Sequence, residues 1–361
     1  MADESKISWT DATFNPWMGC TKVSEACRNC YAERDMDHRY GKAKWGPQGT
    51  RTVTSDANWK KPLRWNRLAA EGKLPDGSVN ADGHRPRVFC ASLADVFEDW
   101  TGPMVDSHGR ELRRGEDQPL GTGPCKGTAG ELLTMTDVRK RLFETIAATP
   151  HLDWLLLTKR PEGIRHRIVE VQYKMNDTEL EAWTTAIDEN VWLGTSVENQ
   201  AAADERIPHL LAVPAKVRFL SCEPLLGPVD LRSVGPLRHD ALIGWKPAHD
   251  GYPEGANTER IGWIICGGES GPQARPSHPD WFRGLRDQCV AAGVAFHFKQ
   301  WGEFLHAHPT ELVPGRPLVG LDGAGQTCGW RDGQIVVQRL GVKTAGRLLD
   351  GREWNEFPKT R

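Results

Sequence analysis

The sequence repeats one arrangement, in which a short apolar run is followed by a few polar residues and then, in several cases, by a stretch with helical spacing of apolar side chains. Continuous apolar runs of about five residues are typical of strands that are buried on both faces. Strands that alternate with helices predict right-handed βαβ units and a parallel sheet. The six clearest runs cover residues 87–91, 154–158, 191–195, 217–221, 263–267 and 295–299.

Helical patterns lie between several of these runs. They cover residues 136–148, 200–211 and 280–292, and Gly293 follows the last of them, as expected at a helix end. A further strand is expected near residues 13–18, which gives six or seven strand–helix units. The pattern predicts an α/β fold with a full or partial TIM-like (β/α) barrel, and a doubly wound sheet is the alternative.

Three segments interrupt the alternation and are predicted to be long loop insertions. They lie at about 41–85, 101–130 and 234–261, and each is longer than an ordinary connection. The strand–helix alternation then stops before the end of the chain. We therefore expect a barrel domain over residues 1–302 and a small C-terminal appendage over residues 303–361.

Composition excludes several classes of protein. The formal net charge of −2 gives no overall attraction to nucleic acid or to an anionic membrane, although it allows a local basic groove. No apolar run approaches the roughly 20 residues of a membrane span, and the polar N-terminus is unlike a secretory signal. We therefore expect a cytoplasmic protein without a membrane partner, whose nine cysteines do not form a disulfide framework.

Polar residues follow nearly every predicted strand. In both parallel architectures ligands bind at the carboxyl ends of the strands, so these residues form a candidate ring. Some of them would serve equally well as helix caps, but charged residues recurring at equivalent positions favour an active site. The ring contains Ser92, Asp95, Lys159, Ser196, Glu198, Glu223, Glu269 and Lys299.

Three cysteines lie close together directly after the first predicted strand. Cys20, Cys27 and Cys30 have the spacing C-x6-C-x2-C. Three thiolates on one loop can bind three irons of a [4Fe–4S] cluster, which leaves the fourth iron open to a substrate or cofactor. With His38 the same cysteines would instead form a closed Cys3His zinc site, and reduced thiols without a metal are a third alternative.

Several motifs of the chain resemble a known family. They are WTDATFNPWMGC at 9–20 with the two later cysteines, LTKR at 157–160, GTSVEN at 194–199, SCEPL at 221–225, GGESG at 267–271 with ARP at 274–276, and FKQWG at 298–302. Together they resemble the phage-type three-Cys-motif proteins, a family of unknown function. That family is similar in turn to radical S-adenosylmethionine (SAM) enzymes, most nearly to the spore photoproduct lyase branch.

This resemblance implies a partial (β/α)6-type TIM-like barrel. It also implies a [4Fe–4S] cluster on Cys20, Cys27 and Cys30, whose open iron chelates the amino and carboxylate groups of SAM. Reductive cleavage of SAM, with an electron donor, would give a 5′-deoxyadenosyl radical that abstracts hydrogen from a substrate. The chain departs from the usual pattern in its cysteine spacing, which is ordinarily C-x3-C-x2-C. It also has Asn29 where an aromatic residue usually stands.

The resemblance also implies roles for the polar residues. Those expected to line the cofactor pocket are Ser92, Asp95, Ser196 and Glu198. Those expected to hold or activate a substrate are Lys159, Glu223, Glu269, Arg275 and Lys299. The phage setting and the lyase likeness imply DNA or a nucleotide as the substrate. The basic, tryptophan-containing segment 60–67 has the composition either of a single-strand binding surface or of a solvated loop.

Interpretations from other classes stay open at this point. One is a nucleic-acid- or partner-binding module with a structural Cys3His zinc site. Another is a barrel hydrolase, although the strand-end segments lack the histidines that metal-dependent hydrolases usually collect. A glycosidase uses two carboxylates, and Glu198 and Glu223 at neighbouring strand ends would suit it.

Overall fold

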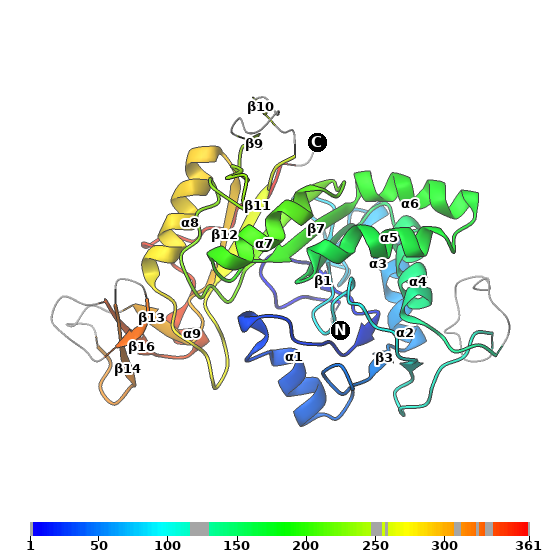
Figure 1. Cartoon of the computed structure of the whole chain (residues 1–361), viewed down its shortest axis with the longest axis horizontal. Helices are drawn as coiled ribbons and strands as arrows, with labels where there is room; N and C mark the ends of the chain where they lie inside the picture. The colour runs from blue at the N-terminus through cyan, green and yellow to red at the C-terminus, as the bar shows by residue number, and fades with distance from the viewer. Residues whose placement is uncertain are drawn as a thin grey trace. The chain divides into compact units, whose positions relative to one another are not determined.

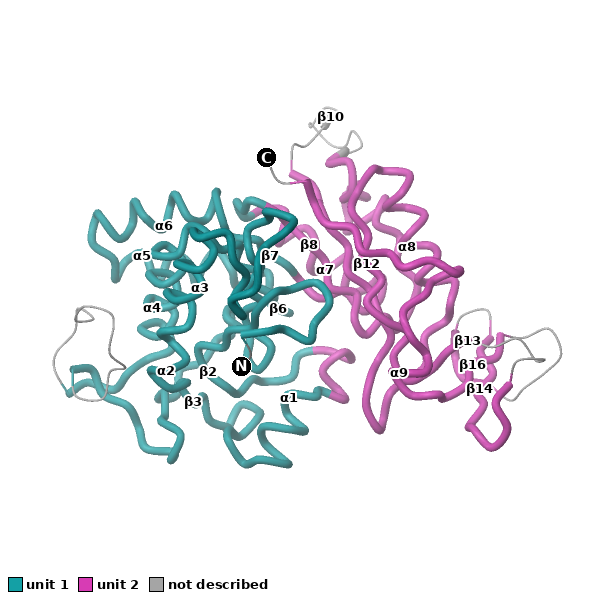
Figure 2. Tube along the Cα trace, turned by 180° about the vertical axis from the view of Figure 1, so that it is seen from behind, with its two compact units in different colours: residues 1–23, 30–194, 213–216 teal, residues 24–29, 195–212, 217–361 magenta. Residues whose placement is uncertain are grey.

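The computed structural model describes residues 3–115, 130–246, 255–256, 259–306, 312–322, 325–328 and 335–359. Cys125 and parts of the second and third predicted insertions lie outside the described residues. The chain divides into two compact units, drawn in teal and magenta in Figure 2. Unit 1 consists of Met1–Val23, Cys30–Gly194 and Val213–Lys216, and unit 2 of Ser24–Asn29, Thr195–Ala212 and Val217–Arg361.

A seven-stranded sheet is the main feature of the fold (Figure 1). Its order is β1 (Ala12–Thr13), β4 (Arg87–Cys90), β6 (Asp153–Thr158), β7 (Val191–Ser196), β8 (Val217–Cys222), β11 (Trp263–Gly267) and β12 (Ala295–Gln300). The pairings of β4 with β1 and β6, and of β11 with β8 and β12, are parallel. The predicted α/β class with a parallel sheet is therefore confirmed.

The order of the described strands bears on the doubly wound alternative. It follows the sequence without a reversal, whereas a doubly wound sheet needs a point at which the order reverses. The doubly wound alternative is therefore wrong. All six apolar runs form strands within one or two residues of the predicted bounds, and every residue of β7 and β8 is buried.

The first strand differs from the prediction. Only Ala12–Thr13 joins the large sheet, while Trp17–Met18 forms β2, which pairs with β3 (Arg51–Val53). β3 also pairs with β5 (Met104–Val105), which completes a separate three-stranded sheet. Pro16 lies between the two strands and has no N–H to donate, so one continuous strand over residues 13–18 is disfavoured.

Unit 1 contains three helices around the first half of the sheet: α4 (Met135–Ala147), α5 (Ile164–Gln172) and α6 (Asp177–Glu189). Figure 1 shows them close together, and Phe143 of α4 stacks on Trp183 of α6 with ring centroids 3.9 Å apart. The α4 helix agrees with the prediction to within one residue. The α5 and α6 helices were not predicted, and a short 3-10 turn, η3 (Pro161–Gly163), precedes α5.

Unit 2 contains the other two predicted helices. α7 (Gln200–Leu211) has the predicted bounds, and α8 (Pro279–Ala292) begins one residue earlier than expected. Gly293 ends α8 with a φ of 65°, a left-handed conformation that glycine adopts without strain. Figure 1 shows α8 beside β12, which follows it after a short turn.

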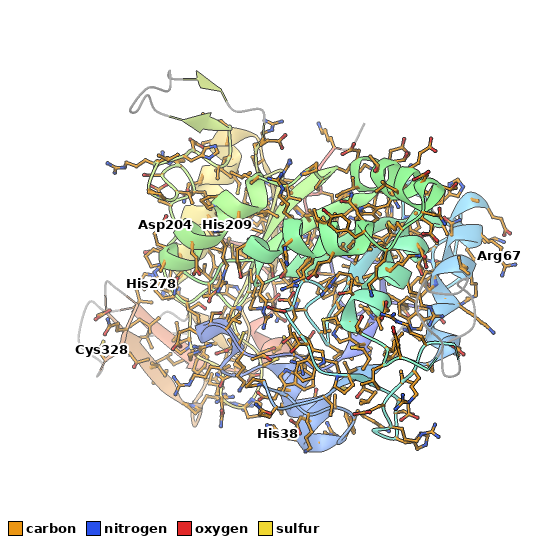
Figure 3. All side chains as sticks on the ribbon, turned by 45° about the vertical axis from the view of Figure 1, so that its right-hand side comes forward. His38, Arg67, Asp204, His209, His278 and Cys328 are labelled. Carbon is orange, nitrogen blue, oxygen red and sulfur yellow. The ribbon has the colours of Figure 1, made fainter. Side chains whose placement is uncertain are left out.

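The first predicted insertion is not simply a loop. It holds β3, α2 (Asp56–Trp59) and α3 (Lys61–Ala70), so the basic segment 60–67 is mostly helical. Trp65 is fully buried and its indole N–H donates to Asp3, so it is not available to stack on a base. The expectation of a solvated loop is therefore wrong, while a single-strand binding surface here stays a prediction that would have to rely on the cations of the helix; Arg67 of the same helix is labelled in Figure 3.

The last 60 residues belong to unit 2. A four-stranded antiparallel sheet has the order β13 (Phe304–His306), β16 (Ile335–Arg339), β14 (Leu318–Leu321) and β15 (Thr327–Cys328). Beyond α9 (Val342–Ala345), the Phe298 N–H donates to the Trp354 carbonyl and the Glu356 N–H to the Phe296 carbonyl. The chain end therefore covers the edge of β12, which would otherwise present unpaired backbone groups.

The third predicted insertion includes a short antiparallel pair, β9 (Trp245–Lys246) and β10 (Gly255–Ala256). No helix among the described residues combines the length and the apolar character that crossing a membrane requires.

Asp137 is a buried carboxylate at the start of α4 in unit 1. It forms a capping box with Thr134 at the start of α4, and its side chain is only 1% exposed. Its carboxylate also accepts hydrogen bonds from Arg114 at 2.8 Å and from Lys174 at 2.6 Å. Burial works to raise the pKa of Asp137, but the bonds from Lys174 and Thr134 hold that pKa below its ordinary value.

We predict that Asp137→Asn lowers the free energy of unfolding by about 2 kcal/mol at neutral pH, because it weakens the capping box and removes the negative charge that pairs with the partly buried Arg114 and Lys174. Since the folded-state pKa is depressed, this stabilisation is present above about pH 4 and is lost as the pH falls through the folded-state value. Urea unfolding at pH 7 and at acidic pH measures both effects.

Glu131→Gln is the matched control. Glu131 pairs with the same Arg114 at 2.7 Å but is 53% exposed, so its loss should cost less than about 1 kcal/mol. Equal costs for the two variants would contradict the assignment of Asp137.

Candidate functional site

The three clustered cysteines lie on the chain that follows β2. Cys27 ends the 3-10 turn η1 (Glu25–Cys27), and Cys30 precedes α1 (Tyr31–Glu33), which continues as the π-helical η2 (Arg34–Arg39). None of the three forms a disulfide, and all three are partly exposed. Three of the other cysteines are fully buried, and burial raises the pKa of each of these thiols; they are Cys90, Cys222 and Cys266.

The candidate metal ligands are divided between the two compact units of the chain. Cys20 and Cys30 belong to unit 1, whereas Cys27 lies in the segment Ser24–Asn29 of unit 2. His38, labelled in Figure 3, lies on η2 in unit 1. Within the part of the chain that the structure describes, no three His, Cys, Asp or Glu side chains form a group that could hold a metal ion.

A buried ion pair in unit 1 fixes the chain directly after Cys20. The Glu98 carboxylate accepts hydrogen bonds from the Arg51 guanidinium at 2.7 and 2.8 Å, and both side chains are buried. Glu98 also accepts from the backbone N–H of Thr21 at 2.8 Å. The position of Thr21 therefore depends on a buried ion pair.

Arg160 joins this network from the end of β6. Its guanidinium donates to Asp95 at 2.9 Å and to the Thr21 carbonyl at 2.6 Å, and it lies 3.8 Å from Cys20 Sγ. Burial raises the pKa of Cys20 to about 12, with Asp95 and Glu98 acting in the same direction and Arg160 against them. In the free chain Cys20 is therefore a neutral thiol.

The predicted cofactor residues of unit 1 lie in the same region. Asp95 is buried and accepts hydrogen bonds from the Thr158 hydroxyl at 2.7 Å and from the Lys159 N–H at 3.0 Å, besides Arg160. Ser92 accepts from Asn15, and its carbonyl accepts from the Tyr31 hydroxyl at 2.8 Å. Asp95 thus links the segments that follow β4 and β6. The Lys159 side chain is partly buried.

Two predicted substrate residues meet in unit 2. Lys299 at the end of β12 donates to both carboxylate oxygens of Glu223, each at 2.9 Å, and Glu223 directly follows β8. Gln300 donates to the same carboxylate at 3.1 Å. The two side chains keep exposed fractions of 24% and 17%, so the pair stands at the carboxyl ends of its strands with access to a ligand.

Ser196 and Glu198 lie in unit 2 as well. Glu198 is buried and pairs with Arg206 of α7 at 2.8 Å, and Arg206 also donates to the Ser196 carbonyl at 2.9 Å. The Ser196 hydroxyl is buried without a hydrogen-bond partner among the described residues. Because its carboxylate is engaged inside the protein, Glu198 does not suit the glycosidase alternative, which needs two carboxylates facing a sugar.

Glu269 and Arg275 form a third pair. The Arg275 guanidinium donates to the two carboxylate oxygens of Glu269 at 2.8 and 2.9 Å, and the Arg275 N–H donates at 2.7 Å. Burial works to raise the pKa of Glu269, but these bonds hold that pKa below its ordinary value. The structure therefore brings two predicted substrate residues into contact with each other.

Sequence analysis missed the cations that organise these clusters. Arg160 stands next to Lys159 in the LTKR motif, and Arg206 lies on a predicted helix, so position alone could have suggested both. Arg51 and Glu98 lie within a predicted insertion and in the segment beyond a strand end. Nothing in their spacing indicates that they pair.

Close packing of the backbone explains why glycine stands at the second position of the GGESG motif, Gly268. A Cβ at this position would lie 1.9 Å from the backbone oxygen of Trp301, because the chain here runs close to the end of β12. The Gly268 N–H donates to the Gln300 carbonyl at 2.9 Å, so the approach is part of a backbone pairing. Only glycine fits without moving the backbone.

We predict that Gly268→Ala lowers the free energy of unfolding by about 2 kcal/mol or more, because the clash is with backbone atoms that cannot turn away. Gly284→Ala is the control: Gly284 lies in α8 with open space around its Cβ position, so alanine there should stabilise by up to about 1 kcal/mol. Urea denaturation of both variants tests this, and a shared sign would count against it.

We also predict that Glu98→Gln costs about 3 kcal/mol of folding free energy, since it leaves the buried Arg51 unpaired. Asp99→Asn should cost less than about 0.5 kcal/mol, because Asp99 is 70% exposed in its pair with Arg167. Thermal and urea unfolding give the stabilities, and hydrogen exchange at Thr21 should rise in Glu98→Gln alone.

Comparison with known proteins gives a family match. The family described as "Protein of unknown function (DUF5131)" matches residues 4–106 and 133–358, which together make up most of the chain. No curated protein and no solved structure matches the chain.

Proposed function

Because the chain belongs to the DUF5131 family, whose description assigns no activity, we propose its function from its own residues. We propose a radical-SAM-like iron–sulfur enzyme in which Cys20, Cys27 and Cys30 bind a [4Fe–4S] cluster. The observation that carries the proposal is the close spacing along the chain of three partly exposed cysteines that form no disulfide. The resemblance to the phage-type three-Cys-motif proteins supports it.

The chemistry of the donor set fits such a cluster. Thiolates are its usual ligands, and three of them leave one iron without a protein ligand. The Arg160 guanidinium beside Cys20 Sγ supplies a positive charge that would offset the negative charge of a thiolate-bound cluster. If held by Cys20, Cys27 and Cys30, such a cluster would supply one iron open to SAM and, with one electron from an electron donor, would allow reductive cleavage of SAM to methionine and a 5′-deoxyadenosyl radical.

The proposal includes the finer part of the fold prediction, a partial (β/α)6-type barrel. Parallel strands that follow one another in sequence order support it, because TIM-type barrels are built in that order. The sheet has seven strands, one more than the barrel type in the proposal. Residues at the carboxyl ends of the strands are then the ones that bind ligands.

Within this proposal the strand-end residues divide into two groups. Those proposed to line the SAM pocket are Ser92, Asp95, Ser196 and Glu198. Lys159 and the Glu223–Lys299 pair are proposed to hold the substrate, and the lysines suit the phosphates of DNA or of a nucleotide. Lys299 is held by two carboxylate contacts, so its ammonium group is already oriented before a substrate arrives.

We predict about four irons per chain after anaerobic purification or reconstitution, with matching sulfide and a brown absorption spectrum. Cys27→Ala should lose most of the iron because it removes one of three ligands. Cys328→Ala is the control, since this partly exposed thiol, labelled in Figure 3, lies on β15 outside the motif. Iron, sulfide and zinc analysis gives the stoichiometries.

The reaction is tested by adding reductant and SAM to the reconstituted protein and measuring 5′-deoxyadenosine. A colourless protein that holds one zinc would contradict the proposal and favour the binding module with a Cys3His zinc site. Loss of that zinc in His38→Ala would then identify the fourth ligand.

A further inference from the structure

The segment Ser24–Asn29, which carries Cys27, has little to hold it apart from polar contacts. Its only regular structure is η1, and no residue of that turn is buried. The Cys27 N–H donates to the Ser24 carbonyl at 2.9 Å and the Arg28 N–H to the Glu25 carbonyl at 3.1 Å. Such a short turn with no buried side chain has little stability of its own.

Polar groups from the loop after β11 contact the segment on both sides of Cys27. Two residues before the cysteine, Glu25 receives the Arg275 guanidinium through its carboxylate at 3.0 Å and its carbonyl at 3.1 Å. Two residues after it, the Asn29 amide donates to Glu269 at 3.2 Å and to the Gln273 carbonyl at 2.7 Å. All of these residues belong to unit 2.

The two residues that make these contacts are themselves fixed. Glu269 is buried, and its carboxylate receives Arg275 in the bidentate geometry that sets the plane of a guanidinium. The Glu269 carbonyl accepts from the Glu303 N–H at 3.0 Å, next to the close approach of Gly268 to Trp301. The remaining donor positions of Arg275 then face Glu25.

We propose that Glu269 and Arg275 are positioning residues that hold the segment Ser24–Asn29 and so present Cys27 for metal binding. This inference rests on the proposed function and replaces the substrate role expected from the sequence. Both carboxylate oxygens of Glu269 and all three guanidinium nitrogens of Arg275 bind groups of the chain itself. Asn29, which departs from the usual aromatic residue, serves as the second point of attachment.

The test uses the full chain without metal. In Arg275→Gln, hydrogen exchange of residues 25–29 and the rate of Cys27 alkylation should each rise about tenfold, because hydrogen bonds to charged groups are lost. Alkylation of Cys20, which is held by the Arg160 network, should stay unchanged. Arg283→Gln is the control, since Arg283 forms comparable ion pairs with Asp350 at a site that does not contact the segment.

A second variant keeps the test valid if Arg275→Gln does not fold. Asn29→Ala removes only the contacts to Glu269 and Gln273, and it should raise exchange in the same segment by a smaller factor. Unchanged exchange and alkylation in both variants, or an increase of the same size in α8, would overturn the positioning role.

Metal loading separates this inference from the proposed function. After reconstitution, release of iron to a chelator should be about tenfold faster in Arg275→Gln than in wild type or Arg283→Gln. If the wild type binds no iron, the proposed function fails, while the exchange and alkylation rates still decide whether the two residues hold the segment. Arg275→Lys should raise the exchange of residues 25–29 and the alkylation of Cys27 less than Arg275→Gln does, because the lysine can keep one contact to Glu269.

Discussion

The buried pair of Arg51 and Glu98 is the contact on which the arrangement around Cys20 depends. Two charges that leave water are tolerated only when they bind each other and satisfy their remaining hydrogen-bonding groups. Glu98 does this through the Thr21 N–H, and the adjoining Arg160 through the Thr21 carbonyl and Asp95. The backbone after Cys20 is therefore a structural partner of the charges, and its position follows from theirs.

The strands could be predicted because burial on both faces requires mostly apolar residues in succession, which can be recognised in the sequence. Apolar runs of about five residues are typical where helices or loops cover both sides of a sheet, and the run at 263–267 is such a case. Pro16 ended the first strand early, and α3 escaped prediction because its buried side chains include an isolated Trp65 among cations. Ion pairs could not be predicted, since Arg51 and Glu98 are far apart in sequence and meet only in the folded chain.

The strand-end residues were predicted as a group, but the structure separates them by how their polar groups are used. Glu198 and Glu269 are buried and bound to arginines of the same unit, so their first role is to hold the fold. Glu223 and Lys299 are also paired, yet they keep enough exposure to meet a ligand. A charged residue at the end of a strand therefore indicates either role, and its exposure and partner decide which one it can perform.

Charged contacts also hold the stretch of chain between Cys20 and Cys27. Six residues separate Cys20 from Cys27, three more than in the radical-SAM cysteine spacing on which the proposed function draws. Thr21 and Glu25, at either end of this stretch, are the residues that the two arginine networks bind. Arg160 binds the carbonyl of Thr21, next to Cys20, and Arg275 binds the carbonyl of Glu25, two residues before Cys27. The added length is therefore not free chain, because charged hydrogen bonds hold it near both cysteines.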